Sequence, residues 1–182
     1  MYALTFFEHS SATLSDIDIG TASDPLNGYN NKGRYPLLIM NGCSSGDCFS
    51  NSKSWGEDWT NVADRGAIAF IGNSDIGFTN QLATYTDYLY REMFQDTSII
   101  GEPIGVQMKH AVKLSTNGSN ITHYLTHTFG MVLQGDPAVR LTTIKAPDLA
   151  IDENSIFLQP INENNVTAVS EEFNVGIVVK NY

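Results

Sequence analysis

Two side chains that could carry out nucleophilic chemistry stand directly behind apolar runs of this sequence. His9 follows the run in "YALTFFEH", and Cys43 follows the run in "YPLLIMNGC". The thiolate is the nucleophilic form of cysteine, and a free thiol titrates near ~8.5, so it needs help at neutral pH. An imidazole within hydrogen-bond reach supplies that help. The two residues therefore predict cysteine-based covalent catalysis, provided that the fold brings His9 and Cys43 together.

The neighbours of Cys43 are small. Asn41-Gly42 precede it and Ser44-Ser45-Gly46 follow it, which leaves room for a peptide and lets backbone N–H groups face a developing oxyanion. The alternative is a buried structural cysteine, because free cysteine is among the most buried residue types. Cys48 is expected to be a bystander, since its spacing from Cys43 suits neither a zinc knuckle nor an unstrained disulfide.

Other chemistries find less support in the sequence. His123 and His127 stand four residues apart, as in a zinc-protease helix, but Tyr124 occupies the place of the general-base glutamate. No third ligand suggests itself, so we expect no metal. The stretch "CSSGD" lacks the G-x-S-x-G elbow of serine hydrolases. Glycines are too sparse for a phosphate-binding loop, and no cofactor is expected.

The composition indicates a globular protein. The 182 residues include 42% hydrophobic and 16% charged residues, enough for one domain with a real core and a small second one. A net charge of -10 argues against a nucleic-acid or anionic-membrane partner. The sequence has no apolar stretch approaching the ~20 residues of a membrane span, and no signal peptide is visible. Because the chain begins inside a predicted strand, we expect it to be a fragment.

The hydrophobic pattern alternates between strands and helices. Short apolar runs predict neighbouring parallel strands at 2–8, 35–41 and 67–71, and apolar stripes at helical spacing predict helices near 54–64, 79–94 and 103–115. A further helix is expected before a tight Gly135-Asp136-Pro137 turn, with a short strand after that turn. The alternation predicts an α/β fold with a largely parallel sheet flanked by helices.

Parallel strands place their following loops on one edge of a sheet, where the working residues of such folds lie. His9, Cys43 and the loop Asn73–Phe78 each follow a predicted strand directly. We therefore predict that His9 and Cys43 face each other across one cleft. Asn73, Ser74 and Phe78 are predicted to bind substrate at its rim, with Phe78 as an apolar wall.

The pattern changes after Lys145. Short alternating runs, separated by Pro, Asn and Glu clusters, predict about three strands and no helix. They are typical of the opening strands of a β-sandwich, too few to close two sheets. We therefore predict a domain at 1–145 and the start of a sandwich at 146–182.

Taken together, four blocks resemble the gingipain family of cysteine peptidases, whose catalytic domain is caspase-like. The blocks are "FFEHSSAT", "LLIMNGCSSGDCF", "WGEDWTNVADRGAIAFIGNSDIGF" and "HYLTHTFGMVLQGDPAVRL", in family order over residues 2–145. The resemblance implies that 1–145 is the C-terminal part of a peptidase domain. The tail is similar to the Ig-like domains that follow such peptidase domains.

The resemblance also implies site roles. Cys43 would be the nucleophile and His9 its imidazole partner, in a dyad without a required third acid. The backbone N–H groups of Cys43 and Ser10 would form the oxyanion hole. Ser10 and Glu8 stand where family members often carry glycine, and the Glu8 carboxylate would either act on the imidazole or point away from it.

The expected function is that of a cysteine endopeptidase acting on extracellular or surface polypeptides. The alternatives are a sortase-like processing transpeptidase of a bacterial secretion system, or an inactive surface or adhesion module with the same fold. The resemblance implies an extracellular or bacterial cell-surface location. Because the family's acidic specificity residue would lie upstream of Met1, we expect the 182-residue chain alone to show little proteolysis.

Overall fold

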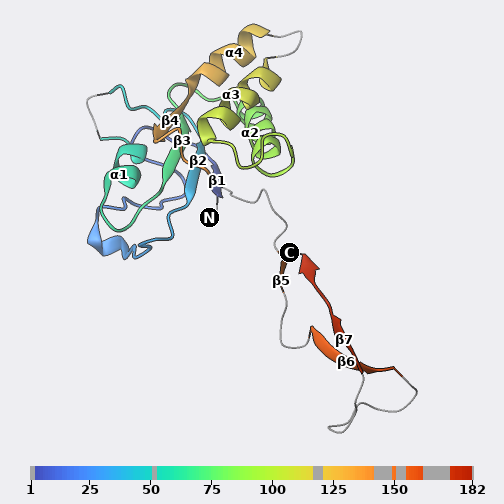
Figure 1. Ribbon diagram of the computed structural model, residues 1–182. Coiled ribbons are helices and arrows are strands. Elements are labelled where there is room, and N and C mark those ends of the chain that lie inside the picture. The colour runs from blue at the N-terminus through green and yellow to red at the C-terminus, as the bar shows by residue number, and fades with distance from the viewer. Residues whose placement is uncertain are drawn as a thin grey trace. The chain divides into compact units, whose positions relative to one another are not determined.

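The computed structural model describes residues 3–50, 53–116, 121–141, 149–150, 155–161 and 173–181 (Figure 1). The chain divides into two compact units, Met1–Thr143 and Ile144–Tyr182. Within the described ranges, no helix combines the length and the apolarity that a membrane crossing needs.

The first unit is built on a four-stranded sheet. Its strands are β1 (Ala3–Phe7), β2 (Leu37–Asn41), β3 (Ala69–Asn73) and β4 (Met131–Gly135), in the order β1-β2-β3-β4. The first three are parallel, as predicted, and β4 runs antiparallel to β3. Every residue of β2 and β3 is buried, including the asparagine that ends each strand. Helices cover both faces of the sheet, so central strands of this kind are mostly apolar.

The described residues of this unit form the α-helices α1 (Trp55–Asn61), α2 (Thr79–Phe94), α3 (Ile104–Ser115) and α4 (Ile121–Gly130). One core cluster joins Leu37, Ile39 and Ile71 to apolar residues of α2 and α3. The other joins Leu38, Met40 and Phe70 to Trp55 and Trp59 of α1. Successive residues of a strand therefore serve opposite faces, and Figure 1 shows α1 on one side of the sheet with α2 and α3 on the other.

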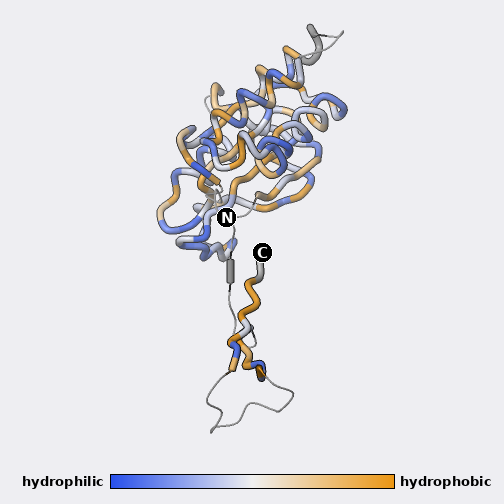
Figure 2. Tube along the Cα trace, turned by 45° about the vertical axis from the view of Figure 1, so that its right-hand side comes forward, coloured by the Kyte–Doolittle hydropathy of each residue, from blue (hydrophilic) through white to orange (hydrophobic). Residues whose placement is uncertain are grey.

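Hydropathy along the chain matches this layering. Figure 2 shows hydrophobic and hydrophilic segments alternating along the helices, as expected where one face of each helix packs on the sheet. The predicted helices at 54–64, 79–94 and 103–115 correspond to α1, α2 and α3. Ser54 caps α1 through a capping box with Glu57, which explains why the helix begins at Trp55.

The prediction for the end of this unit was wrong in one element. A strand was expected after the Gly135-Asp136-Pro137 turn, but residues 136–141 form none, and β4 precedes the turn. The run "MVLQG" directly follows α4 without a loop, and a short apolar run does not distinguish helix from strand. Pairing with β3 from Asn73–Met131 to Ala69–Gly135 decides in favour of the strand.

The second unit contains short antiparallel pairs. β5 (Leu149–Ala150) pairs with β8 (Lys180–Asn181), and β6 (Ile156–Pro160) pairs with β7 (Phe173–Ile177). The apolar side chains of β6 and β7 are largely exposed. The assignment of this unit as the start of an Ig-like sandwich stays a prediction.

Candidate active site

Strand register places the two predicted catalytic residues at the same level of one sheet edge. β1 and β2 are parallel and pair Phe7 with Asn41 at their carboxyl ends. His9 and Cys43 each lie two residues beyond that pair. Their loops therefore leave the sheet side by side.

Direct contacts join the two loops. The Ser10 hydroxyl donates a hydrogen bond to the carbonyl oxygen of Cys43 at 3.0 Å. Gly42 lies so close to the histidine loop that a Cβ atom there would stand 2.0 Å from Ser10 Oγ and 2.8 Å from the Glu8 carbonyl oxygen. A side chain at position 42 would push the loops apart, so this glycine is required by the close approach.

A cavity of about 380 Å³ opens between the loops and is lined by both His9 and Cys43. Its volume lies in the range of ~300–1,000 Å³ usual for ligand sites. The full lining comprises Phe7, Glu8, His9, Asp16, Ile17, Asn41, Gly42, Cys43, Gly77, Thr79 and Leu82. The lining therefore carries two carboxylates, an imidazole and a thiol beside apolar surface, and it includes no lysine or arginine from the described ranges.

The loop that carries Cys43 is held by the sheet itself. The Ser45 hydroxyl, which is fully buried, donates to the Met40 carbonyl oxygen at 2.9 Å. The backbone N–H of Gly46 donates to the carbonyl oxygen of Asn73, the last residue of β3, at 2.9 Å. Ser44 adopts a left-handed conformation, with φ of 53°, which gives the chain a sharp turn just behind Cys43.

Gln134 of β4 connects this loop to α1. Its Nε2 donates to the Gly46 carbonyl oxygen at 3.2 Å, and its Oε1 accepts a hydrogen bond from the Ser54 hydroxyl at 3.1 Å. A single amide thus joins the loop that carries Cys43 to the N-terminus of α1. Sequence reasoning missed Gln134, because a polar residue on an edge strand gives no local signal of such a contact.

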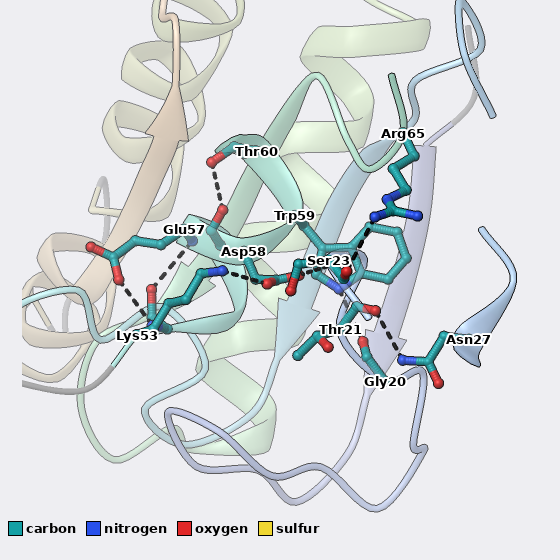
Figure 3. Close-up of polar contacts among 12 residues, drawn as sticks. Gly20, Thr21, Ser23, Asn27, Lys53, Glu57, Asp58, Trp59, Thr60 and Arg65 are labelled. Atoms are coloured by element: carbon teal, nitrogen blue, oxygen red, sulfur yellow. Dashed lines mark hydrogen bonds and ion pairs between the residues drawn. The ribbon is translucent and has the colours of Figure 1, made fainter. Parts of the chain in front are cut away.

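Helix α1 also holds the segment that follows the histidine loop, as the close-up in Figure 3 shows. The Asp58 carboxylate accepts a hydrogen bond from the backbone N–H of Ser23 at 2.9 Å and forms an ion pair with Lys53 Nζ at 2.7 Å. The indole of Trp59 donates to the Gly20 carbonyl oxygen at 3.2 Å. Burial raises the pKa of Asp58, but the hydrogen bonds from Lys53 and Ser23 outweigh it and hold this pKa below its ordinary value.

Gly77 is the nearest backbone neighbour of the Cys43 sulfur among the contacts described. Its N–H donates to Cys43 Sγ at 3.4 Å, and its carbonyl oxygen lies 3.9 Å from the same sulfur. Cys43 and Cys48 are both free and partly exposed. The loop after β3 therefore reaches the thiol through its main chain.

The three predicted substrate-binding residues occupy different surroundings, and none of them lines the cavity. Asn73 is 1% exposed, and its amide donates to the Asp75 carbonyl oxygen at 2.8 Å. Ser74 is half-buried, with its backbone N–H bound to the Gly130 carbonyl oxygen. Phe78 is 58% exposed, and its ring centroid lies 4.9 Å from that of His127 in an edge-on contact. Gly77 and Thr79 line the cavity instead.

The Glu8 carboxylate makes a hydrogen bond within its own loop. Its Oε2 accepts the backbone N–H of Ile17 at 2.8 Å, which closes the histidine loop. Its Oε1 is buried without a hydrogen-bond partner among the described residues. Of the two alternatives for this carboxylate, the contact with Ile17 favours a role in loop structure.

The histidine pair on α4 shows no metal-binding arrangement in the described part. His127 is buried and packs against Phe78, while the side chain of His123 lies outside the described residues. Within the described ranges, no group of three His, Cys, Asp or Glu side chains could hold a metal ion.

The fold is thus an α/β fold with a mixed sheet, and a cysteine and a histidine lie at the carboxyl edge of its parallel strands. The sequence model of Peptidase family C25 matches residues 1–142. The chain therefore belongs to this family, the gingipain family of cysteine peptidases, and the predicted family and fold class are confirmed. None of the curated proteins matched the sequence.

Three solved structures share the fold. A protease structure has a TM-score of 0.62 at 19% identity, with 87% of this chain and 39% of that chain covered. The Arg-specific cysteine proteinase gingipain R (RgpB) has a TM-score of 0.62 at 13% identity, with 84% and 36% covered. The complex of Porphyromonas gingivalis RgpB pro- and mature domains has a TM-score of 0.58 at 14% identity, with 84% of this chain and 37% of that chain covered. The chain thus spans less than two fifths of each of these structures.

Proposed function

We propose that Cys43 and His9 form the catalytic dyad of a cysteine endopeptidase acting on extracellular or surface polypeptides. The observation that carries this proposal is that the side chains of Cys43 and His9 line the same cavity, at the carboxyl ends of neighbouring parallel strands. Membership in a cysteine peptidase family supports the same reaction class.

In the proposed reaction, the His9 imidazole accepts the proton of the Cys43 thiol, and Sγ attacks the carbonyl carbon of the scissile peptide. The imidazolium then protonates the leaving amine, and a thioester links the acyl group to Cys43. Water hydrolyses the thioester and regenerates the thiol. An amine attacking in place of water would give the transpeptidase alternative from the same intermediate.

Ser10 and Cys43 are the proposed oxyanion donors. The Ser10 hydroxyl already ties the two residues together through the Cys43 carbonyl oxygen. The backbone N–H groups of Ser10 and Cys43 donate no hydrogen bond to another described residue. Cys43 lines the cavity, and Ser10 directly follows His9, which lines it too. Two such donors are the usual means of stabilising a tetrahedral oxyanion.

The rim residues keep narrower proposed roles. Phe78 and Ser74 flank the loop whose Gly77 lines the cavity, so a longer peptide leaving the cavity on that side would contact them. Asn73 is too deeply buried for such contact and acts by holding the loop.

The test is a peptide-library assay at neutral pH on the natural protein that carries this chain, by mass spectrometry of the products. Cys43→Ala and His9→Ala should each lower turnover by at least ~10³-fold, since each removes a member of the dyad. Cys48→Ala is the matched control and should retain activity. An active Cys43→Ala variant would overturn the mechanism, and an inactive parent with an inert Cys43 would favour the non-enzymatic surface module.

A further inference from the structure

We propose that the backbone N–H of Gly77 is a hydrogen-bond donor to the Cys43 thiolate, and that the buried side chain of Asn73 positions it. The proposal deepens the proposed function, because it presumes that Cys43 reacts as a thiolate. It assigns a catalytic contact to a main-chain group and a positioning role to a residue that does not touch the cavity.

The sulfur makes two hydrogen bonds with the main chain of Gly77. In the longer one, the thiol donates to the Gly77 carbonyl oxygen at 3.9 Å. The Gly77 N–H approaches the sulfur more closely, at 3.4 Å, as a donor. A hydrogen bond that is made to the charged form of a group favours that form. The shorter contact is therefore the one that a thiolate keeps, because it needs no proton on the sulfur.

The position of Gly77 depends on the carbonyl group of Asp75, two residues earlier. That oxygen accepts two hydrogen bonds, one from the backbone N–H of Ser44 at 2.9 Å and one from Asn73 Nδ2 at 2.8 Å. The first ties the loop to the turn behind Cys43, and the second ties it to the end of β3. Both acceptor sites of the carbonyl are thereby occupied, and the loop is fixed relative to the sulfur.

Asn73 is enclosed in a way that leaves its amide little freedom. Its Oδ1 would stand 2.4 Å from a Cβ atom at Gly130, and its Nδ2 would stand 3.2 Å from one at Gly77. The side chain thus lies between α4 and the loop, at 1% exposure. Truncating it would remove one of the two hydrogen bonds to the Asp75 carbonyl oxygen and leave the side chains of Cys43 and His9 unchanged.

The decisive experiment measures the thiolate rather than peptide turnover. In a Cys48→Ser background, the rate of Cys43 alkylation by iodoacetamide is followed across pH for the parent and for Asn73→Ala. We expect the pH midpoint of alkylation to rise by about one unit in Asn73→Ala, as for the loss of a hydrogen bond to a charged group. An unchanged midpoint in a folded variant would overturn the proposal.

Gln107→Ala is the matched control. Gln107 is also a fully buried carboxamide that donates to a loop carbonyl, that of Ile99 at 3.5 Å, but it belongs to α3 and makes no described contact with the Cys43 loop. Its removal should lower the melting temperature and leave the alkylation midpoint in place. An equal shift in both variants would show a general loosening and would contradict the positioning role.

A second measurement needs no destabilising variant. In the intact protein labelled with ¹⁵N, the Gly77 amide resonance should move with the same pH midpoint as Cys43 alkylation, and Cys43→Ala should abolish that transition. A Gly77 resonance that ignores the ionisation would overturn the proposal even if Asn73→Ala failed to fold. Because neither readout involves peptide cleavage, absence of peptidase activity would count against the proposed function alone.

Discussion

The loop carrying Cys43 and the loop carrying His9 are held in different ways. The cysteine loop is bound to the sheet, through Ser45 to β2, through Gly46 to the end of β3 and through Gln134 to β4. Several of the contacts in the histidine loop are internal to it, such as Asp16 N–H to the His9 carbonyl oxygen, and its apolar side chains are exposed. The difference indicates that Cys43 is held more firmly than His9.

The largest effect is expected from crowding the rigid loop. In Gly46→Ala, the new Cβ would lie 2.3 Å from the carbonyl oxygen of Gly72, a backbone atom that cannot turn aside. We expect a loss of roughly 3 kcal/mol in the free energy of unfolding, measured by urea titration. We also expect slower alkylation of Cys43, measured by labelling with iodoacetamide.

The control is Gly28→Ala, where φ is 69° but no atom lies within 4 Å of the new Cβ. Only the cost of a left-handed backbone applies there, roughly 1–2 kcal/mol. Equal losses in both variants would contradict the claim that the cysteine loop is packed tightly against the sheet.

A smaller effect should follow from the anchor on α1. The folded-state pKa of Asp58 is lowered, so its contribution to stability is present above its ordinary value of 3.8 and is lost as the pH falls through the folded-state pKa. Asp58→Asn should therefore cost roughly 1–3 kcal/mol at neutral pH, and the difference from wild type should narrow in acid. Urea titrations of both proteins from neutral to acidic pH measure this difference in the free energy of unfolding. A difference that widens in acid would contradict the lowered pKa of Asp58.

The smallest effect is expected in the histidine loop. The Glu8 carboxylate accepts a hydrogen bond from the backbone N–H of Ile17 at an exposed position. The side-chain amide oxygen of a glutamine can accept the same hydrogen bond. Glu8→Gln should change stability by less than ~1 kcal/mol and leave the rate of Cys43 alkylation unchanged within about twofold. A large change in that rate would mean that the carboxylate acts on His9 and that the two loops are not as different as described.

The sequence predicted the parallel strands and the main helices because continuous apolar runs and helical stripes are local signals. It also indicated which loops would share an edge, since that follows from parallel topology. For the third loop it named Asn73, Ser74 and Phe78, whereas Gly77 and Thr79 line the cavity. Phe78 packs against His127 instead, and the main chain of Gly77 approaches the sulfur, because tertiary packing decides those orientations.

Competitive alkylation of the two cysteines tests the central claim most directly, since Cys48 is an internal control in the same molecule. Both thiols are free and partly exposed, so access alone does not favour Cys43. With limiting iodoacetamide at neutral pH and peptide mass spectrometry, we expect Cys43 to react at least about tenfold faster than Cys48, as for an imidazole-activated thiol. His9→Ala should remove most of that preference. Equal rates in the wild-type protein, or a preference unaffected by His9→Ala, would contradict the account.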